Sequence, residues 1–158
     1  MSDSNYHLAQ LNIARMLAPL DDPIMADFVN NLDRINQLGK NSAGFVWLLQ
    51  DESGNATALR PFDDDMLIIN LSVWHSIESL HQYAYYSDHA EMYRRRRDWF
   101  EKLEMPAVVM WWIPVGHIPT LAESKERYDL LHQHGATPQA FTFKQRFSPA
   151  DLSELVNR

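Results

Sequence analysis

The segment MLIINLSVW, Met66 to Trp74, carries the strongest strand signal in the chain. Its residues are mostly aliphatic or β-branched, the composition that favours a pleated strand. A nearly continuous apolar run is typical of a strand buried on both faces. The segments before it, DESGNA and PFDDD, are typical of turns. We therefore expect this segment to be a strand of a sheet, buried on both faces.

Three other segments predict strands. HLAQLNIA, His7 to Ala14, alternates between two sides, with Leu8, Gln10 and Asn12 on one and Ala9, Leu11 and Ile13 on the other. GFVWLLQ, Gly44 to Gln50, and AVVMWWIPV, Ala107 to Val115, are short apolar runs. AFTFKQRF near the C-terminus predicts a further extended segment.

Helix signals lie between these strands. Asp22 before Pro23 predicts the start of a helix, and Gly39 stands where a glycine would end it. Ser76 predicts a cap for the next helix.

Ser87-Asp88, with Glu91 after it, predicts a second cap and a helix over about residues 88–102. Thr120 and Glu123 form a capping box for a helix ending near His134, with Gly135 as its stop, and SPADLSELVN predicts a terminal helical turn.

The resulting order is β-α-β-β-α-β followed by an extra C-terminal helix, an α+β class with a ferredoxin-like antiparallel sheet. With 158 residues we expect one domain over 1–158, with a core at about 6–116 and an extension at 117–158. Helices on one sheet face leave the other needing cover. We expect a homodimer packed through that face, or a monomer that covers it with its C-terminal tail.

Composition bounds the function. The chain is 46% hydrophobic and 22% charged, typical of a globular protein, and its net charge of -7 argues against nucleic-acid binding. It has no cysteine, which fits a reducing compartment. No signal peptide is evident and no apolar run approaches the roughly 20 residues of a membrane span. We expect a cytoplasmic protein with no membrane partner.

Several longer segments resemble a known family. They are HLAQLNIAR, PIMADFVNNLDRIN, GFVWLLQDESGNAT, NLSVW, RRRRDWF, WWIPVGHIPT and GATPQAFTF. Together they are similar to a bacterial domain-of-unknown-function family, family 3291, over about residues 6–144. That family is grouped with the dimeric α/β-barrel superfamily, alongside the antibiotic-biosynthesis monooxygenases.

The resemblance implies several activities, namely cofactor-free oxygenation of quinol-like aromatics, haem cleavage, isomerisation, dechlorination or ligand binding. Fold alone does not choose among them. Haem-degrading relatives use an asparagine on the first strand, a tryptophan and a histidine. Asn12 matches the first, but the other two positions hold Tyr83 and Tyr93, so the resemblance provides no iron ligand.

A candidate catalytic stripe lies on the second helix. His89, Tyr93 and Arg96 share one side of it at helical spacing. The resemblance implies that this side faces a pocket between helices and sheet. There His89 would serve as a base and Arg96 would hold a carboxylate or phenolate. The alternative is that His89 and Tyr93 are core residues, with Arg96 bridging a dimer.

Tryptophans and amides on the strands are the candidate substrate-binding residues. Trp47, Trp74 and Trp111 could line an apolar cavity for a flat aromatic ligand, or could be core. Asn12 and Gln10 point the same way on an apolar strand. They either donate to a ligand or satisfy each other and the nearby backbone.

The sequence predicts no cofactor and no metal. His132 and His134 do not face each other on a helix, and Asp63 to Asp65 lacks the pattern of a calcium loop. Phosphate-loop, dinucleotide and nucleophile-elbow motifs are also missing from the sequence.

The four arginines Arg94 to Arg97 do not form one basic face, because consecutive residues spread around a helix. Three have acidic neighbours, which predicts the pairs Arg95–Glu91, Arg94–Asp98 and Arg97–Glu101. Arg96 has Met92, Tyr93, Trp99 and Phe100 instead. We expect an anion from a ligand or partner subunit to meet Arg96.

Three function hypotheses follow. The first is a cofactor-independent monooxygenase for a small quinol-like aromatic, with His89 and Arg96 in its site. The second is a non-catalytic dimeric binder of a small apolar acid. The third is a structural or partner-binding module, for which we expect tightly packed aromatics and no closed pocket.

Overall fold

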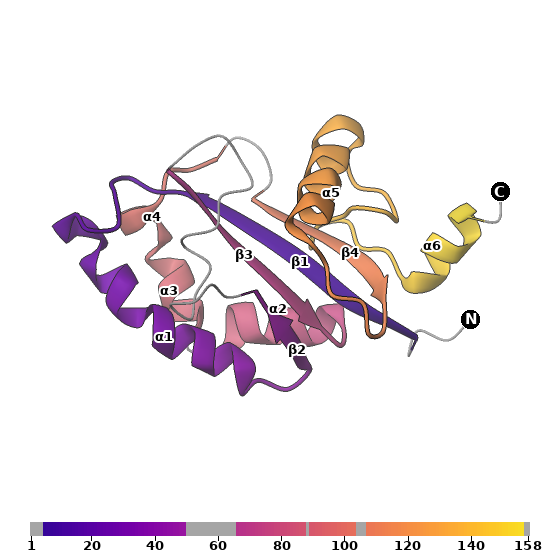
Figure 1. Cartoon of the computed structure of the whole chain (residues 1–158), viewed down its shortest axis with the longest axis horizontal. Helices are drawn as coiled ribbons and strands as arrows, with labels where there is room; N and C mark the ends of the chain where they lie inside the picture. The colour runs from indigo at the N-terminus through magenta and orange to yellow at the C-terminus, as the bar shows by residue number, and fades with distance from the viewer. Residues whose placement is uncertain (1–4, 50–65, 88, 104–106, 157–158) are drawn as a thin grey trace.

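The computed structural model describes residues 5–49, 66–87, 89–103 and 107–156, with the side chains of residues 89 and 153–156 left out (Figure 1). Within these residues the strands are β1 (Tyr6–Arg15), β2 (Phe45–Leu48), β3 (Leu67–Trp74) and β4 (Val108–Pro114). They form one antiparallel sheet in the order β2-β3-β1-β4. Each of the four predicted strands is confirmed, and the one predicted at Met66 to Trp74 is β3, which begins at Leu67 and is buried along most of its length.

Helices lie on both sides of this sheet (Figure 1). One face carries four helices, namely α1 (Ala26–Lys40), α2 (Ile77–Tyr86), α3 (His89–Arg94) and α4 (Arg96–Trp99). We call this face the helix-side face. The opposite face carries α5 (Leu121–His134), and α6 (Pro149–Val156) follows near the C-terminus. The described chain is therefore a mixed α+β structure with an open four-stranded antiparallel sheet.

The strand register decides which residues face which helices. Leu8 is opposite Trp74, and both pack with Leu80 of α2. Leu11 is opposite Leu71, and both belong to the cluster that contains Leu131 of α5. Because side chains alternate along a strand, each strand contributes to two cores.

The C-terminal extension covers the sheet face that lacks the first four helices. Leu11, Leu71, Val109 and Trp111 on that face have no exposed surface. Leu121, Tyr128 and Leu130 of α5 pack against this cluster. The C-terminal extension therefore covers the centre of this sheet face.

The extension also bridges to the β4 edge, within the segment AFTFKQRF. Met110 and Phe141 exchange backbone hydrogen bonds of 2.8 and 2.9 Å. Ala140 then packs on the α5 side and Phe141 on the α2 side. Such pairing protects an edge strand that would otherwise present unpaired backbone groups.

Most predicted helix ends are confirmed by their caps. Ser76 forms a capping box with Ser79, and Thr120 accepts a hydrogen bond from the Glu123 backbone N–H at 3.0 Å. Asp22 accepts from the Ile24 N–H at 3.0 Å, although the turn after it is a 3-10 helix, Pro23–Met25. Gly135, with φ 72°, follows α5 as expected.

The prediction that Gly39 ends the first helix is wrong. Helix α1 continues to Lys40 and is capped by Asn41. Gly39 is buried, and a Cβ there would lie 3.4 Å from the Tyr83 ring. The glycine therefore allows Tyr83 of α2 to approach α1, a packing role that local sequence does not reveal.

The predicted helix over about residues 88–102 is interrupted at Arg95 and ends at Trp99. Phe100 is extended and bridges to Met16 beyond the end of β1. Trp99 is 2% exposed and packs with Met16 and Phe28. Burial of this indole favours a break that the helical spacing alone does not predict.

Gly44 offers a test of close packing between the β2 entry and α2. Its φ is 83°, and a Cβ would lie 2.4 Å from Ser79 Cβ. Gly116, with φ 94°, has open space around it. We expect Gly116→Ala to lower the free energy of unfolding by about 1 kcal/mol through backbone strain. Gly44→Ala should lose about 1–3 kcal/mol more through overpacking. Urea unfolding measures both, and equal losses would contradict the clash.

Candidate functional site

A band of polar side chains crosses the helix-side face of the sheet. It consists of Gln10 and Asn12 on β1 and Asn70 and Ser72 on β3. Asn12 is directly opposite Asn70, and Gln10 is opposite Ser72. The band separates two hydrophobic clusters, one around Leu8, Trp74 and Trp112 and one around Met16, Phe28 and Trp99.

Gln10 joins the two strands through its side-chain amide. Its Nε2 donates to Asn70 Oδ1 at 2.6 Å and to Ser72 Oγ at 2.7 Å. Trp74 Nε1 also donates to Ser72 Oγ, at 2.9 Å. Gln10 and Ser72 are 5% and 3% exposed, so the network is buried. Gln10 is thus satisfied across the sheet, one of the two predicted alternatives, but by β3 rather than by Asn12.

This network leaves two donors available. Ser72 Oγ accepts two hydrogen bonds, so its remaining capacity is its own O–H. Asn70 accepts through Oδ1, so its NH₂ group is also left to donate. Neither donor meets an acceptor among the residues that the structure describes. A ligand oxygen would satisfy both.

The two donors line a small cavity of about 20 Å³ between the sheet and the helices. Tyr83 of α2 and Asn36 of α1 complete its helix side. This volume holds about one water molecule. Asn70 is exposed although it lies on an interior strand and faces the helices, which shows that the cleft opens to solvent there.

Aromatic rings fill the inner end of the cleft. The Tyr83 ring is stacked on Trp74 with centroids 5.0 Å apart and 28° between the planes. Phe45 meets the same indole edge-on at 5.5 Å. Tyr83 occupies the position that a flat ligand would take against Trp74.

Tyr83 is held as a neutral phenol. Burial raises the pKa of its hydroxyl well above the ordinary value. The hydroxyl donates to the Ile35 carbonyl oxygen of α1 at 3.2 Å. Tyr83 therefore acts as a hydrogen-bond donor and aromatic wall rather than as a base near neutral pH.

The predicted tryptophan set is divided by the sheet. Trp74 lies beside the polar band, whereas Trp47 and Trp111 pack on the α5 side. Trp111 Nε1 donates to Glu123 Oε2 at 2.8 Å, and the other oxygen of Glu123 lies 2.6 Å from His117 Nε2. The three indoles therefore do not share one pocket.

Two residues of the predicted catalytic stripe, Tyr93 and Arg96, lie away from the cleft. Tyr93 is 40% exposed, and Arg96 rests over its ring at 4.2 Å. Arg96 also donates to the Tyr93 carbonyl oxygen at 2.9 Å. His89 begins α3, but its side chain lies outside the described residues. Arg96 is thus half-buried against an aromatic ring rather than beside Asn12 and Trp74.

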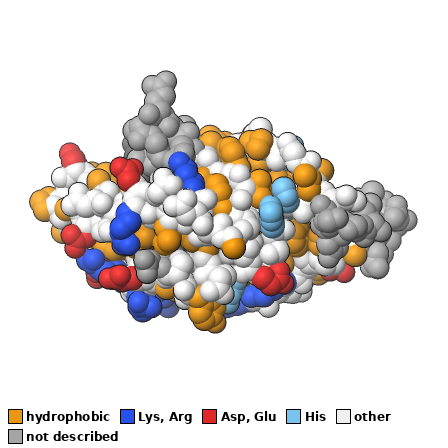
Figure 2. All heavy atoms as spheres, turned by 90° about the horizontal axis from the view of Figure 1, so that it is seen from below, with side chains coloured by type: hydrophobic (Ala, Val, Ile, Leu, Met, Phe, Trp, Pro, Cys, Tyr) orange, Lys and Arg blue, Asp and Glu red, His pale blue; other side chains and the backbone are white. Residues whose placement is uncertain are grey.

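The ion pairs predicted for the other arginines do not form among the described residues. Arg95 instead bridges Asp27 of α1 at 2.9 Å and Asp98 at 3.1 Å. Arg97 donates to the backbone oxygen of Glu101 at 3.4 Å. The break at Arg95 changes the helical spacing on which the predicted pairs depend. Figure 2 shows basic and acidic side chains interspersed on the face seen from below.

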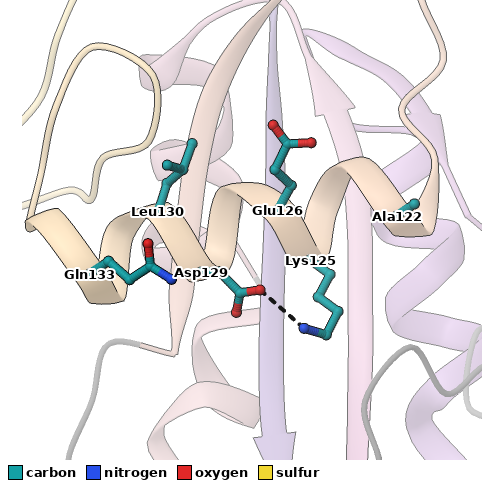
Figure 3. A pocket seen from close by; sticks show the side chains of 6 residues that line it. All are labelled: Ala122, Lys125, Glu126, Asp129, Leu130 and Gln133. Atoms are coloured by element: carbon teal, nitrogen blue, oxygen red, sulfur yellow. Dashed lines mark hydrogen bonds and ion pairs between the residues drawn. The ribbon is translucent and has the colours of Figure 1, made fainter.

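A larger hollow of about 400 Å³ lies along α5 and is a poorer candidate. The described residues that line it are Ala122, Lys125, Glu126, Asp129, Leu130 and Gln133 (Figure 3). They all come from one helix, and Lys125 and Asp129 pair with each other at 3.0 Å. A ligand site usually needs polar groups that converge from several elements.

Metal-binding clusters and membrane-spanning helices can be assessed only for the described residues. Among them, no three histidine, aspartate or glutamate side chains come together in a group that could hold a metal ion. Their helices also lack the combination of length and apolarity needed to cross a bilayer.

Comparison with known families decides the classification. The model of a family described as "Domain of unknown function (DUF3291)" matches residues 7–156. The chain belongs to this family. The resemblance seen in the sequence is thereby confirmed for DUF3291. The comparison with curated proteins returned no match.

Solved structures similar to this DUF3291 chain are distant. PA3566 from Pseudomonas aeruginosa has TM-score 0.46 and 13% identity, covering 70% of this chain and 95% of its own. A conserved protein from Methanosarcina mazei Go1 has TM-score 0.46 and 14% identity, and the match covers 71% of this chain and 95% of that one. SnoaB, a cofactor-independent oxygenase from Streptomyces nogalater, has TM-score 0.43 and 13% identity. That match also covers 71% of this chain and 95% of the other. At these scores none supports an argument about activity.

Asn70 and Ser72, the most informative residues of the cleft, lie in a segment whose composition predicts a buried apolar strand. Polar residues within such a run signal a hydrogen-bonding requirement, and this is the signal that could have found them. Asn36 carries no sequence signal, because only tertiary packing brings it to the cavity.

The network predicts a large cost for removal of one hydroxyl. Ser72→Ala leaves the Trp74 indole N–H and one Gln10 N–H without their acceptor. We expect the free energy of unfolding to fall by about 2–3 kcal/mol, the cost of buried donors left unpaired. The control Ser42→Ala removes only one part-buried hydrogen bond, to the Leu38 carbonyl, and should lose about 1 kcal/mol. Urea unfolding distinguishes them, and a Ser72→Ala loss no larger than the control's would refute the network's importance.

Proposed function

We propose that this DUF3291 chain binds a small flat phenol in the cleft between α2 and the sheet and oxygenates it without a bound cofactor. The observation that supports this function is the pair of donors, Ser72 O–H and Asn70 NH₂, beside the Trp74 ring. Preorganised donors that line one cavity can bind an oxygen that carries developing negative charge.

The proposed substrate uses each part of the cleft. Its phenolic oxygen accepts hydrogen bonds from Asn70 and Ser72, and its ring lies on Trp74. The two donors stabilise the phenolate after deprotonation. His89 remains our proposed base, in accordance with the hypothesis from sequence.

The proposed reaction balances without an external reductant. A phenolate gives electrons to O₂, and a ring C–H becomes C=O. One oxygen atom of O₂ enters the product, and the other leaves as water. With 1-naphthol the products are 1,4-naphthoquinone and water.

Binding requires the cleft to open. A cavity of about 20 Å³ is much smaller than an aromatic ring, so Tyr83 has to leave the Trp74 face as substrate enters. Tyr83→Ala would provide this space permanently. We expect 1-naphthol to quench Trp74 fluorescence and to bind the variant more tightly than wild type.

Oxygen uptake with 1-naphthol tests the activity. We expect wild type to consume O₂ and to place one ¹⁸O atom from ¹⁸O₂ in the quinone, as mass spectrometry would show. Asn70→Asp replaces the donor with an anion and should lower kcat/KM about 100-fold, the usual effect of losing one oxyanion donor. Asn30→Asp makes the same change on the exposed side of α1 and should leave kcat/KM unchanged.

The pattern of results separates the hypotheses. O₂ uptake abolished by His89→Ala supports the oxygenase. Binding without O₂ uptake supports the alternative, a non-catalytic binder of a small apolar acid, whose carboxylate would use the same two donors. No binding by wild type or Tyr83→Ala overturns both and leaves the structural module.

We further propose the ferredoxin-like, dimeric α/β-barrel form of this fold. The alternation of strands and helices and the sheet order β2-β3-β1-β4 support it. On the α5 side, the β2 edge carries the half-buried residues Val46, Trp47 and Leu49. A second copy packed on this part of the sheet face would cover them.

Native mass spectrometry tests this dimer. We expect twice the chain mass for wild type and the monomer mass for Trp47→Glu, because a carboxylate would be buried in the apolar interface. Leu17→Glu changes a 44% exposed residue elsewhere and should remain dimeric. A monomeric wild type would refute the proposal.

A further inference from the structure

A second cluster, separate from the cleft, lies where α2, α3, α4 and the C-terminal extension meet. Tyr85 of α2 is at its centre. Tyr93 of α3 meets it edge-on at 5.3 Å, and Phe143 of the extension meets it edge-on at 5.7 Å. We call Tyr85, Tyr93, Phe143, Arg96 and Arg146 the Tyr85 cluster.

Each outer ring of the Tyr85 cluster carries an arginine. The Arg96 guanidinium lies 4.2 Å from the Tyr93 centroid, and that of Arg146 lies 5.5 Å from the Phe143 centroid. Each arginine donates one backbone hydrogen bond, to Tyr93 O at 2.9 Å and to Phe143 O at 3.0 Å respectively. These contacts orient the half-buried Arg96 and the exposed Arg146, and each guanidinium has further N–H groups that can donate.

Neither arginine forms an ion pair with any described residue. The chain has 21 acidic and 14 basic residues, so acidic groups are not scarce. Arg95, the neighbour of Arg96, shows the contrast because it bonds two aspartates. Two oriented cations without acidic partners are the arrangement expected at a site for an external anion.

Both cations act on the same hydroxyl. Burial and the adjacent Tyr93 hydroxyl raise the pKa of Tyr85, whereas the charges of Arg96 and Arg146 lower it. Tyr93 and Phe143 both contact the Tyr85 ring, so the two arginines that lie over them are both near Tyr85. An anion near that hydroxyl would interact with both of them.

We propose that the Tyr85 cluster binds the phosphoryl group of a small phosphorylated molecule between Arg96 and Arg146. A phosphate dianion balances two guanidinium charges and offers three oxygens to their N–H groups and the tyrosine hydroxyls. The exposed edges of Tyr93 and Phe143 provide contact for an organic substituent. The site is independent of the cleft and of the oxygenase proposal.

Isothermal titration with inorganic phosphate and with phenyl phosphate, at constant ionic strength, tests this inference. We expect saturable binding of one ligand per chain. Equal affinities for the two probes would identify the ligand as free phosphate. Tighter binding of phenyl phosphate would identify it as a phosphate ester. No saturable binding of either probe overturns the proposal.

Matched arginine variants locate the site. We expect Arg96→Gln and Arg146→Gln each to weaken phosphate binding about tenfold, through loss of a charge-assisted hydrogen bond. Arg97→Gln removes the same charge from an exposed position on α4 and should change binding little. Arg96→Lys keeps the charge but not the fork of donors, and should recover part of the affinity.

An equal loss in Arg97→Gln would show non-specific attraction and overturn the assignment. Circular dichroism of each variant checks that it is folded. Because 1-naphthol carries no phosphate, its binding to the cleft should be unchanged in Arg146→Gln, so failure of one proposal does not affect the other.

Discussion

The hydrogen bonds from Gln10 to Asn70 and Ser72 are the interaction on which the site depends. They tie the two central strands together on the face where apolar packing is interrupted. A buried amide needs this satisfaction, since an unpaired group would cost about 1–3 kcal/mol. The same bonds set the direction in which Asn70 and Ser72 can donate. The network that stabilises the sheet thus also creates the two donors of the proposed site.

The sheet serves different purposes on its two faces. On the α5 side its centre is apolar and is buried by the C-terminal extension, whereas Val46, Trp47 and Leu49 at the β2 edge are only half-buried. On the helix side, α2 and the segment around Trp99 bury opposite ends, and the polar band lies between them. A cleft can open only along this band, because elsewhere large side chains fill the space between sheet and helices. Tyr83 closes the inner end of the cleft, and its close approach to α1 is possible because Gly39 has no side chain.

The arginine run illustrates how one break in a helix redistributes charge. Arg95 lies at the break and ties α1 to α4 through Asp27 and Asp98. Arg96 starts the next helical turn and rests on Tyr93, beside Tyr85. A continuous helix would have given both residues different neighbours. The position of Arg96 in the Tyr85 cluster therefore depends on the helix break that burial of Trp99 favours, although Trp99 is not part of that cluster.

Periodicity, capping residues and long shared segments are local properties, so the four strands, most helix caps, the α+β class and the family could be predicted from the sequence alone. The residue pattern also marked Asn12 and Gln10 as unusual on an apolar strand, and Arg96 as a cation without acidic neighbours. Three features depended on tertiary packing. Asn70 and Ser72 complete the Gln10 network, Trp47 and Trp111 lie on the opposite face from Trp74, and Tyr85 and Arg146 join Arg96. The physical reason is that these hydrogen bonds and ring contacts join residues that are far apart in the chain. Which residues meet depends on strand register, helix breaks and burial acting together, and none of these is a local property of the sequence.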